Sequence, residues 1–260
     1  MSRIALQMYT MRDYMNDITQ VADTLQKVSA IGYRNVQISV PAFMTVRQLR
    51  EMLDANDLKA DSVFAPSMTI PENIDSILET AQILGTDVLR TDSIPKELCG
   101  SPEGYRTYAA QLNTDGALLH SHGMKFYYHF HAFEFIRFAQ CRGIDILLNE
   151  TDPDTVGFQP DVFWLTAAGT EPSTSLKLFK GRAEYMHVKD YVILPRLGVI
   201  EDVQRTFAPV GMGNLHWPGI IKTADEIGIK RFVVEQDSCD GDPFEAIRAS
   251  FDNLRGMGLE

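Results

Sequence analysis

The sequence is poor in cysteine, and it has no long apolar run. Only three cysteines occur in 260 residues, Cys99, Cys141 and Cys239, an odd number at distant positions. This excludes a disulfide framework and is typical of a reducing compartment, so we expect a cytoplasmic protein. No segment reaches the roughly 18 apolar residues of a membrane span. Residues 1–13 lack the apolar core of a secretory signal, so we expect neither a membrane partner nor a leader peptide.

Positive charge is also scarce. Lys and Arg number 24 against 35 Asp and Glu, which gives a formal net charge of −11. A protein that holds nucleic acid on a basic face has the opposite balance, so we expect no nucleic-acid partner. Most of the acidic surplus is interpreted as solvated surface charge, and a few carboxylates could instead surround a cation.

What the chain does contain is a regular alternation of strand-like and helix-like segments. Short apolar segments typical of strands recur about every 30 residues, the length of one βα unit. The eight strands are predicted at 4–8, 35–39, 59–64, 87–91, 125–129, 156–160, 185–188 and 232–235. Amphipathic helices are predicted at 18–31, 46–55, 73–84, 105–122, 143–150, 164–180, 217–227 and 243–257. Residues 191–216 are the one long stretch expected to be irregular.

Eight βα units without a linker predict an α/β fold, a single (β/α)₈ barrel in one domain over residues 1–260. The alternative is an open, doubly wound sheet that binds a dinucleotide. The glycine-rich segment 211–214 follows a late strand and lacks the full dinucleotide fingerprint, which favours the barrel.

In such a barrel the chemistry lies where the strands end at their carboxyl side. Acidic, imidazole and other polar residues follow most of the predicted strands: Gln7, Tyr9, Gln37, Arg90, Asp92, His129, His131, Glu134, Asp161, His187, Lys189, Asp190, Glu235 and Asp237. Carboxylates and imidazoles from separate strands that point into one mouth can bind Mn²⁺, Co²⁺, Mg²⁺ or Zn²⁺. Taken alone, Asp161 could equally cap the following helix, and His129 and His131 could be core residues.

Several motifs together resemble one family. The segment YHFHAFEF at 128–135 is similar to its YHNHxFEF signature, and QPDVFW at 159–164 with Ala168-Gly169 is similar to LDxxW…AG. HVKD at 187–190 matches HxKD, and VEQD at 234–237 matches VEQD. APVGMGNL at 208–215 and QMYTMRD at 7–13 resemble two further motifs. From about residue 4 to residue 254 the chain therefore resembles the xylose isomerase-like TIM barrels, also called sugar phosphate isomerases/epimerases.

The resemblance implies a divalent metal ion bound at the barrel mouth by Glu, Asp, His and Glu. Asp161, His187 and Glu235 match the last three ligands. The first place falls on strand five, where many relatives carry Glu. We assign it to His129, with His131 and Glu134 as alternatives. Two further departures are Gln159-Pro160 in place of Glu-Leu, and Gln37 in place of a glutamate.

The resemblance further implies a metal-dependent isomerase or epimerase of a sugar or keto-sugar, which removes a proton next to a polarised carbonyl. Glu235 is expected to be the catalytic base, and Glu134 or a strand-five histidine is expected to act on the opposite face. The expected substrate-binding residues are His131, Lys189, Arg90, Tyr9, Gln7 and Asp237. No basic, glycine-rich phosphate loop follows strands seven and eight, which favours an unphosphorylated sugar.

Three other functions remain as alternatives. A keto-sugar lyase or dehydratase would use the same proton abstraction, and a non-catalytic sugar-binding barrel would lack turnover. An abasic-site endonuclease needs more metal ligands than six histidines supply here, and the net charge of −11 disfavours it. The expected partner is a small sugar, and whether the chain forms a homo-oligomer is left open.

Overall fold

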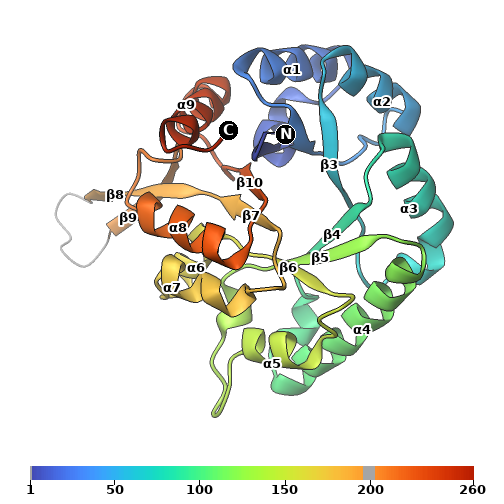
Figure 1. The fold of residues 1–260 in the computed structure, drawn as a ribbon, viewed down its shortest axis with the longest axis vertical. Helices are drawn as coiled ribbons and strands as arrows, with labels where there is room; N and C mark the ends of the chain where they lie inside the picture. The colour runs from blue at the N-terminus through green and yellow to red at the C-terminus, as the bar shows by residue number, and fades with distance from the viewer. Residues whose placement is uncertain (1, 196–202) are drawn as a thin grey trace.

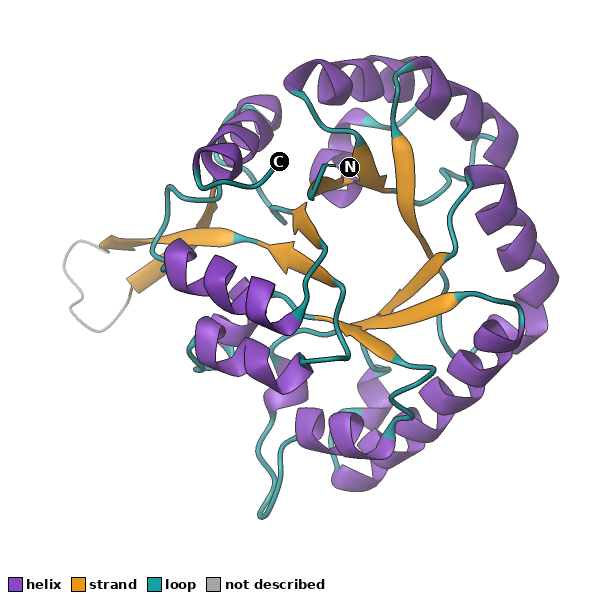
Figure 2. Ribbon diagram, in the orientation of Figure 1, coloured by secondary structure: helices purple, strands orange, loops and turns teal. Residues whose placement is uncertain are grey.

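The chain folds into a barrel of eight parallel strands surrounded by helices (Figures 1 and 2). The computed structural model describes residues 2–195 and 203–260. The strands follow the order β6-β5-β4-β3-β2-β1-β10-β7 around the sheet. They are β1 (Ile4–Gln7), β2 (Asn35–Gln37), β3 (Lys59–Phe64), β4 (Val88–Asp92), β5 (Lys125–His129), β6 (Gly157–Gln159), β7 (Tyr185–Val188) and β10 (Arg231–Val234). The predicted (β/α)₈ barrel is confirmed.

The strands are short and mostly buried. All four residues of β1 are buried, as are all three of β2. Helices cover a parallel sheet from outside, so the sequences of its strands are rich in apolar residues. This explains why sequence alone locates the strands to within about a residue or two.

The helices bury one face each against the strands. They are α1 (Ile18–Ile31), α2 (Val46–Ala55), α3 (Ile70–Leu84), α4 (Pro102–Ser121), α5 (Gly143–Glu150), α6 (Val162–Ala167), α7 (Pro172–Ser175), α8 (Trp217–Ile227) and α9 (Pro243–Gly256). On α1, Val21, Leu25 and Val28 are fully buried, as the helical spacing predicts. The Asp17 side chain caps this helix and accepts from the backbone N–H of Gln20 at 2.9 Å. The predicted ranges of α1, α2, α5 and α8 are confirmed to the residue.

The prediction of one helix at 164–180 is wrong. The segment is divided into α6, α7 and a 3₁₀ helix at Leu176–Phe179. The break comes at Gly169, whose φ of +77° lies in the left-handed region. Glu171 then caps α7, and Pro172 opens it where a missing N–H costs nothing.

The prediction that 191–216 is irregular is wrong for residues 191–195 and 203–208, which form strands. β8 (Asp190–Pro195) pairs with β9 (Val203–Ala208) as an antiparallel ribbon that projects beyond the ring of helices (Figure 1). A search for parallel βα units misses such a ribbon, although Val192, Ile193 and Thr206 are typical strand residues. Residues 196–202 of the predicted stretch lie outside the described residues.

The barrel closes between β6 and β7. Fewer backbone groups pair there than between the other neighbouring strands of the barrel. In the described residues this seam has one isolated parallel bridge, Asp161 with His187. Two backbone hydrogen bonds support it, from His187 N–H to Pro160 O at 2.8 Å and from Phe158 N–H to Arg182 O at 2.6 Å. The strands β4 and β5, by contrast, share a register of five residue pairs. Among the described helices, none combines the length and the apolar character needed to cross a membrane.

Candidate metal centre

Four potential metal ligands converge inside the carboxyl end of the barrel. His129 ends β5, Asp161 follows β6, His187 lies in β7, and Glu235 follows β10. One ligand atom from each residue can be chosen so that all four lie within 4.8 Å of one another. All four side chains are buried. Parallel strands place their carboxyl ends at one edge, so these residues meet although they lie far apart in the sequence.

Three of these ligand atoms make no hydrogen bond of regular geometry, although the Lys189 ammonium lies within ion-pair distance of two of them. They are Asp161 Oδ2, His187 Nδ1 and Glu235 Oε2, and each is shielded from solvent. His187 Nδ1 lies 3.9 Å from Asp161 Oδ2 and 2.9 Å from Glu235 Oε2. Leaving buried polar atoms without directed partners costs several kcal/mol. A cation between them would remove that cost, so these residues fit a divalent metal ion.

Asp161 shows that capping and metal binding do not exclude each other. Its Oδ1 accepts from the backbone N–H groups of Phe163 at 2.8 Å and Trp164 at 3.1 Å and so caps α6. Its Oδ2 is left facing the other ligands without a hydrogen-bond partner. One oxygen of this carboxylate therefore caps α6, and the other lies where it could bind a metal ion, so the two interpretations of Asp161 are compatible.

The two histidines have their ring protons fixed by neighbouring acceptors. His129 Nδ1 lies 3.2 Å from the backbone oxygen of Gln159, which only accepts, so Nδ1 carries the proton and Nε2 keeps its lone pair. His187 Nε2 lies 2.9 Å from Gln37 Oε1, which leaves the lone pair on Nδ1. Such contacts behind a ligand fix the ring orientation and the tautomer.

Gln37 owes its orientation to two further buried amides. Its Oε1 accepts from Gln159 Nε2 at 3.1 Å and from Gln7 Nε2 at 3.4 Å, while its own Nε2 donates to Gln159 Oε1 at 3.2 Å. The sequence indicated no role for either glutamine: Gln37 was one of the polar residues at strand ends, and both Gln37 and Gln159 were departures from the family pattern. The signal that could have found them is their position: each lies at the carboxyl end of a strand, with its side chain inside the barrel.

Lys189 already brings one positive charge to the cluster. Its Nζ lies 3.2 Å from Asp161 Oδ2, 2.9 Å from Glu235 Oε2 and 3.2 Å from Asp237 Oδ2. Burial favours the neutral amine, but the three carboxylates outweigh it and raise the pKa of Lys189. Lys189 is therefore protonated at neutral pH.

The pKa values of the ligands are shifted in different directions. Burial raises the pKa of Asp161, partly opposed by Lys189 and His187. Burial also acts to raise the pKa of Glu235, but Lys189 and His187 outweigh it and the pKa is lowered well below its ordinary range. Burial, followed by the neighbouring histidines, lowers the pKa of His129. A neutral His129 and an ionised Glu235 are the forms that bind metal ions.

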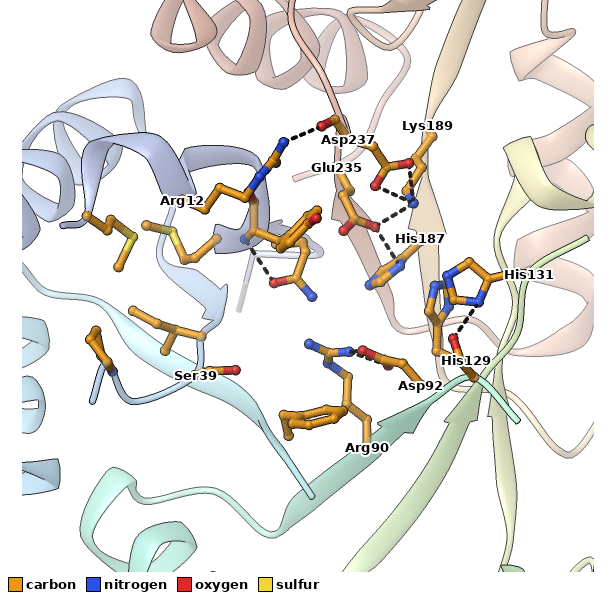
Figure 3. A pocket seen from close by; sticks show the side chains of 18 residues that line it. Arg12, Ser39, Arg90, Asp92, His129, His131, His187, Lys189, Glu235 and Asp237 are labelled. Carbon is orange, nitrogen blue, oxygen red and sulfur yellow. Dashed lines mark hydrogen bonds and ion pairs between the residues drawn. The ribbon is translucent and has the colours of Figure 1, made fainter. Parts of the chain in front are cut away.

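The six residues predicted to bind substrate all line one pocket above this cluster, with a volume of about 630 Å³: Gln7, Tyr9, Arg90, His131, Lys189 and Asp237. Figure 3 shows His131, Lys189 and Asp237 near the histidine and glutamate ligands, with Arg90 beside Asp92. Asp92 also lines the pocket and pairs with the Arg90 guanidinium. His131 Nδ1 lies 3.1 Å from the Ser93 hydroxyl, and burial lowers the pKa of its ring to about 4.

Glu134 lies elsewhere than expected. It is fully buried and does not line the pocket. The 3₁₀ turn Phe133–Phe135 folds its carboxylate back toward β5, where it accepts from the His131 backbone N–H at 2.9 Å and from the Tyr128 hydroxyl. Both oxygens are thereby used within the protein. Glu134 supports the His131 backbone rather than reaching a ligand or a substrate directly.

Asp190 is a further residue whose role the sequence did not reveal. Its carboxylate accepts from the backbone N–H groups of Gly211 at 3.0 Å, Gly213 at 3.1 Å and Leu215 at 3.2 Å. It also accepts from Trp217 Nε1 at 2.6 Å. The Asp190 side chain is buried, and it anchors the loop after β9.

Comparison with known proteins agrees with this geometry. A family model described as "Xylose isomerase-like TIM barrel" matches residues 25–257. Two curated inosose dehydratases, from two strains of Clostridium perfringens, are 29% identical over 159 residues. The match covers 56% of this chain and 53% of theirs, so the chain spans about half the length of the curated relatives it matches.

Solved structures share the fold. A sugar phosphate isomerase/epimerase from Parabacteroides distasonis superposes with a TM-score of 0.78 at 21% identity, covering 99% of this chain and 94% of that one. A xylose isomerase-like TIM barrel protein from Mycobacterium smegmatis, in complex with magnesium, gives a TM-score of 0.70 at 17% identity, covering 96% and 95%. The match of the family model to most of the sequence goes further than the shared fold. On that ground, the chain belongs to the xylose isomerase-like TIM barrel family.

Proposed function

We propose that this chain, as a single domain over residues 1–260, binds one divalent metal ion and isomerises or epimerises a keto-sugar or keto-cyclitol. The observation that carries the proposal is the convergence of four buried ligand atoms within 4.8 Å of one another, of which those on Asp161, His187 and Glu235 make no hydrogen bond of regular geometry. His129 completes the set with a lone pair whose position its Nδ1 contact fixes. This donor set of two imidazoles and two carboxylates accommodates Mn²⁺, Co²⁺, Zn²⁺ or Mg²⁺.

A metal ion bound there supplies a Lewis acid that polarises a carbonyl and stabilises the negative charge that develops on its oxygen. The protein supplies the proton transfers. Glu235 is ionised because Lys189 and His187 lower its pKa, and it lines the pocket. We assign it the removal of the proton next to the carbonyl. The protonated Glu235 would return that proton to the neighbouring carbon in an isomerisation. In an epimerisation the proton on the other face would come from a water molecule, which His131, neutral at pH 7 and also in the pocket wall, would orient.

Lys189 and Arg90 would hold the substrate's oxygen atoms. Both are buried at the pocket and both are fixed in place, Lys189 by three carboxylates and Arg90 by Asp92. A cation held in this way needs little reorganisation when charge develops beside it.

A dehydratase is the second candidate, favoured by the similarity to the inosose dehydratases. It would share the proton abstraction by Glu235, after which a hydroxyl on the next carbon would leave as water. The protonated Lys189, close to Glu235, would provide the proton for that hydroxyl.

The metal site is tested first by Asp161→Asn and His187→Ala. Asparagine keeps an oxygen that can cap α6, so Asp161→Asn should fold while losing bound metal in calorimetric titration with Mn²⁺. The exposed residues Asp154→Asn and His122→Ala are the matched controls and should bind metal normally. Full metal occupancy in both site variants would refute the assignment.

The reaction is tested by NMR in D₂O on a panel of keto-sugars and inososes, with each of the four metals. Solvent deuterium at the carbon beside the carbonyl, without loss of mass from the skeleton, would support an isomerase or epimerase. Loss of water would support the dehydratase. If a panel member binds but incorporates no deuterium with any of the four metals, the proposed activity is overturned. The protein would then be a non-catalytic sugar-binding barrel.

A further inference from the structure

We propose that the pocket takes a keto-sugar that carries a planar apolar group, such as an aryl substituent, rather than a free sugar or a sugar phosphate. This rests on the proposed function, because it assumes that the sugar ring lies at the metal cluster. The inference comes from the opposite wall of the same pocket, to which the reaction assigns no role.

The pocket has two chemically different sides. The side formed by the ends of β4, β5, β7 and β10 is polar and charged, and Figure 3 shows its labelled members Arg90, His131, Lys189 and Asp237. The other side is formed after β1, β2 and β3 and is mostly apolar: Met8, Tyr9, Met15, Ile38, Pro41 and Phe64. Arg12 and Ser39 are labelled on that side in Figure 3, and Ser39 lies across the pocket from His131. A small polyol bound at the metal cluster would leave this apolar wall uncovered.

Two aromatic rings of the apolar wall are unusually exposed. Tyr9 is 53% exposed and Phe64 37% exposed, although both line the pocket. Neighbouring exposed apolar side chains in a cavity mark a surface that a ligand covers. Flat rings favour a flat partner, because stacked or edge-on contacts add to the area that is buried.

A guanidinium group lies beside each of the two rings. The Arg12 guanidinium lies 4.2 Å from the centre of the Tyr9 ring, and it donates to the Tyr9 backbone oxygen at 2.9 Å and the Asp237 backbone oxygen at 2.8 Å. The Arg90 guanidinium lies 5.7 Å from the centre of the Phe64 ring. Rings fixed before binding lose little conformational entropy when a ligand packs on them.

Volume and charge both argue against the simpler ligands. The cavity of about 630 Å³ lies in the range of roughly 300–1,000 Å³ that accepts drug-sized molecules. A phosphate would need free cations, but Arg90 pairs with Asp92, and Lys189 pairs with Asp161, Glu235 and Asp237. Among the described residues that line the pocket, Arg12 is the one Lys or Arg without a carboxylate partner.

The test compares phenyl and methyl glycosides, which bind without reacting. Calorimetric dissociation constants are measured for phenyl and methyl pairs of glucose, galactose and xylose, on protein with and without Mn²⁺. We expect the phenyl member to bind at least about tenfold more tightly, the gain that even one small apolar group gives in a hydrophobic pocket. Phe64→Ala should bring the ratio close to one, and Phe64→Trp should restore it. Leu178→Ala, a change at an exposed apolar residue outside the pocket, should leave the ratio unchanged.

The outcomes separate this inference from the proposed function. A phenyl-to-methyl ratio near one in the unaltered protein, or no binding of either member of any pair, overturns the inference. A high ratio that Phe64→Ala does not change also overturns it, because the aryl group would then lie elsewhere. Failure of the proposed function would instead appear as absent Mn²⁺ binding, and a Phe64-dependent ratio would still support an aryl-binding wall in that case.

Discussion

At the scale of single residues, the site depends on amides as much as on ligands. Gln37 accepts from the Nε2 of His187 and so leaves Nδ1 free to face Asp161 and Glu235. An amide here keeps the acceptor without adding a third buried carboxylate to the cluster. Gln37 is thus a positioning residue for the metal centre, although it does not belong to the ligand set.

We therefore expect Gln37→Leu to weaken metal binding by about 10- to 100-fold, the usual effect of losing a partner behind a ligating histidine. Isothermal titration with Mn²⁺ and Zn²⁺ measures it. Gln37→Glu retains an acceptor oxygen and should lose less affinity than Gln37→Leu. The surface change Gln82→Leu controls for the chemistry of the substitution. Equal affinity in Gln37→Leu and the unaltered protein would contradict the role given to this amide.

Glu134 makes stability depend on pH. Burial raises its pKa to about 7, above the ordinary value of 4.5. The folded state thus holds this proton more tightly than the unfolded state, so the free energy of unfolding falls as pH rises from about 4.5 to 7. In Glu134→Gln the amide can still accept from the His131 N–H and can donate to Tyr128.

Glu134→Gln should therefore be more stable than the unaltered protein at pH 8, by about 1–3 kcal/mol, with the difference vanishing near pH 4. Denaturant unfolding in the presence of a chelator, across pH 4–8, measures the difference. The exposed Glu51→Gln should follow the unaltered protein at every pH. A difference that stays constant over this range would show that ionisation of Glu134 is not its cause.

Residue types at the strand ends predicted much of the candidate site. Asp161, His187 and Glu235 could be selected because each follows a short apolar strand and matches a motif, and the structure brings them together with His129. The sequence could not choose among His129, His131 and Glu134, since the choice depends on side-chain direction. His129 and His131 both reach the pocket, while Glu134 turns back to Tyr128, and nothing in the sequence distinguishes these directions.

At the scale of elements, regular βα units were predictable and interruptions of them were not. Helices such as α1 follow from apolar spacing and a capping aspartate. The division of 162–179 depends on a left-handed Gly169 and on the cap of α7, which are weak local signals inside an apolar pattern. The β8–β9 ribbon could not be foreseen because it lies outside the parallel sheet.

The loop after β9 is fastened by Asp190, and one glycine makes this possible. A Cβ on Gly213 would lie 2.2 Å from Asp190 Oδ1 and 2.5 Å from the Tyr191 backbone oxygen. We expect Gly213→Ala to destabilise the protein by about 1–3 kcal/mol, the range for forcing an extra methyl group into packed surroundings. Thermal and denaturant unfolding measure the loss.

Gly100→Ala is the matched control, because a Cβ there meets nothing within 4 Å. It should change the free energy of unfolding by no more than a few tenths of a kcal/mol. If both variants lose the same stability, the Asp190 contacts do not explain the need for glycine at 213.

At the scale of the whole molecule, the weakly paired seam between β6 and β7 coincides with the metal centre. The one bridge that joins these strands in the described residues pairs Asp161 with His187, two of the four candidate ligands. One of the two buried carboxylates of the cluster, Asp161, therefore lies where the backbone pairing of the barrel is weakest.

Removing the metal should thus loosen this seam first. Mn²⁺ at 100 times its dissociation constant should stabilise the protein by about 2.7 kcal/mol relative to protein in chelator. Amide hydrogen exchange should show the largest loss of protection on chelation at Phe158 and His187, whose N–H groups bond across the seam. Amides of the β4–β5 ladder are the internal control and should change least. A uniform change along the chain would contradict a local effect.

Because two candidate ligands lie at the β6–β7 seam, the seam also affects how fast a bound metal ion would dissociate. Asp161 follows β6 and His187 lies in the neighbouring strand β7. A metal ion held by both residues would therefore leave only after a side chain rotates or the two strands separate. Both side chains are buried and have little room to rotate. The metal ion would then exchange with solvent no faster than β6 and β7 separate. The dissociation rate of the metal ion would therefore measure how often these two strands separate.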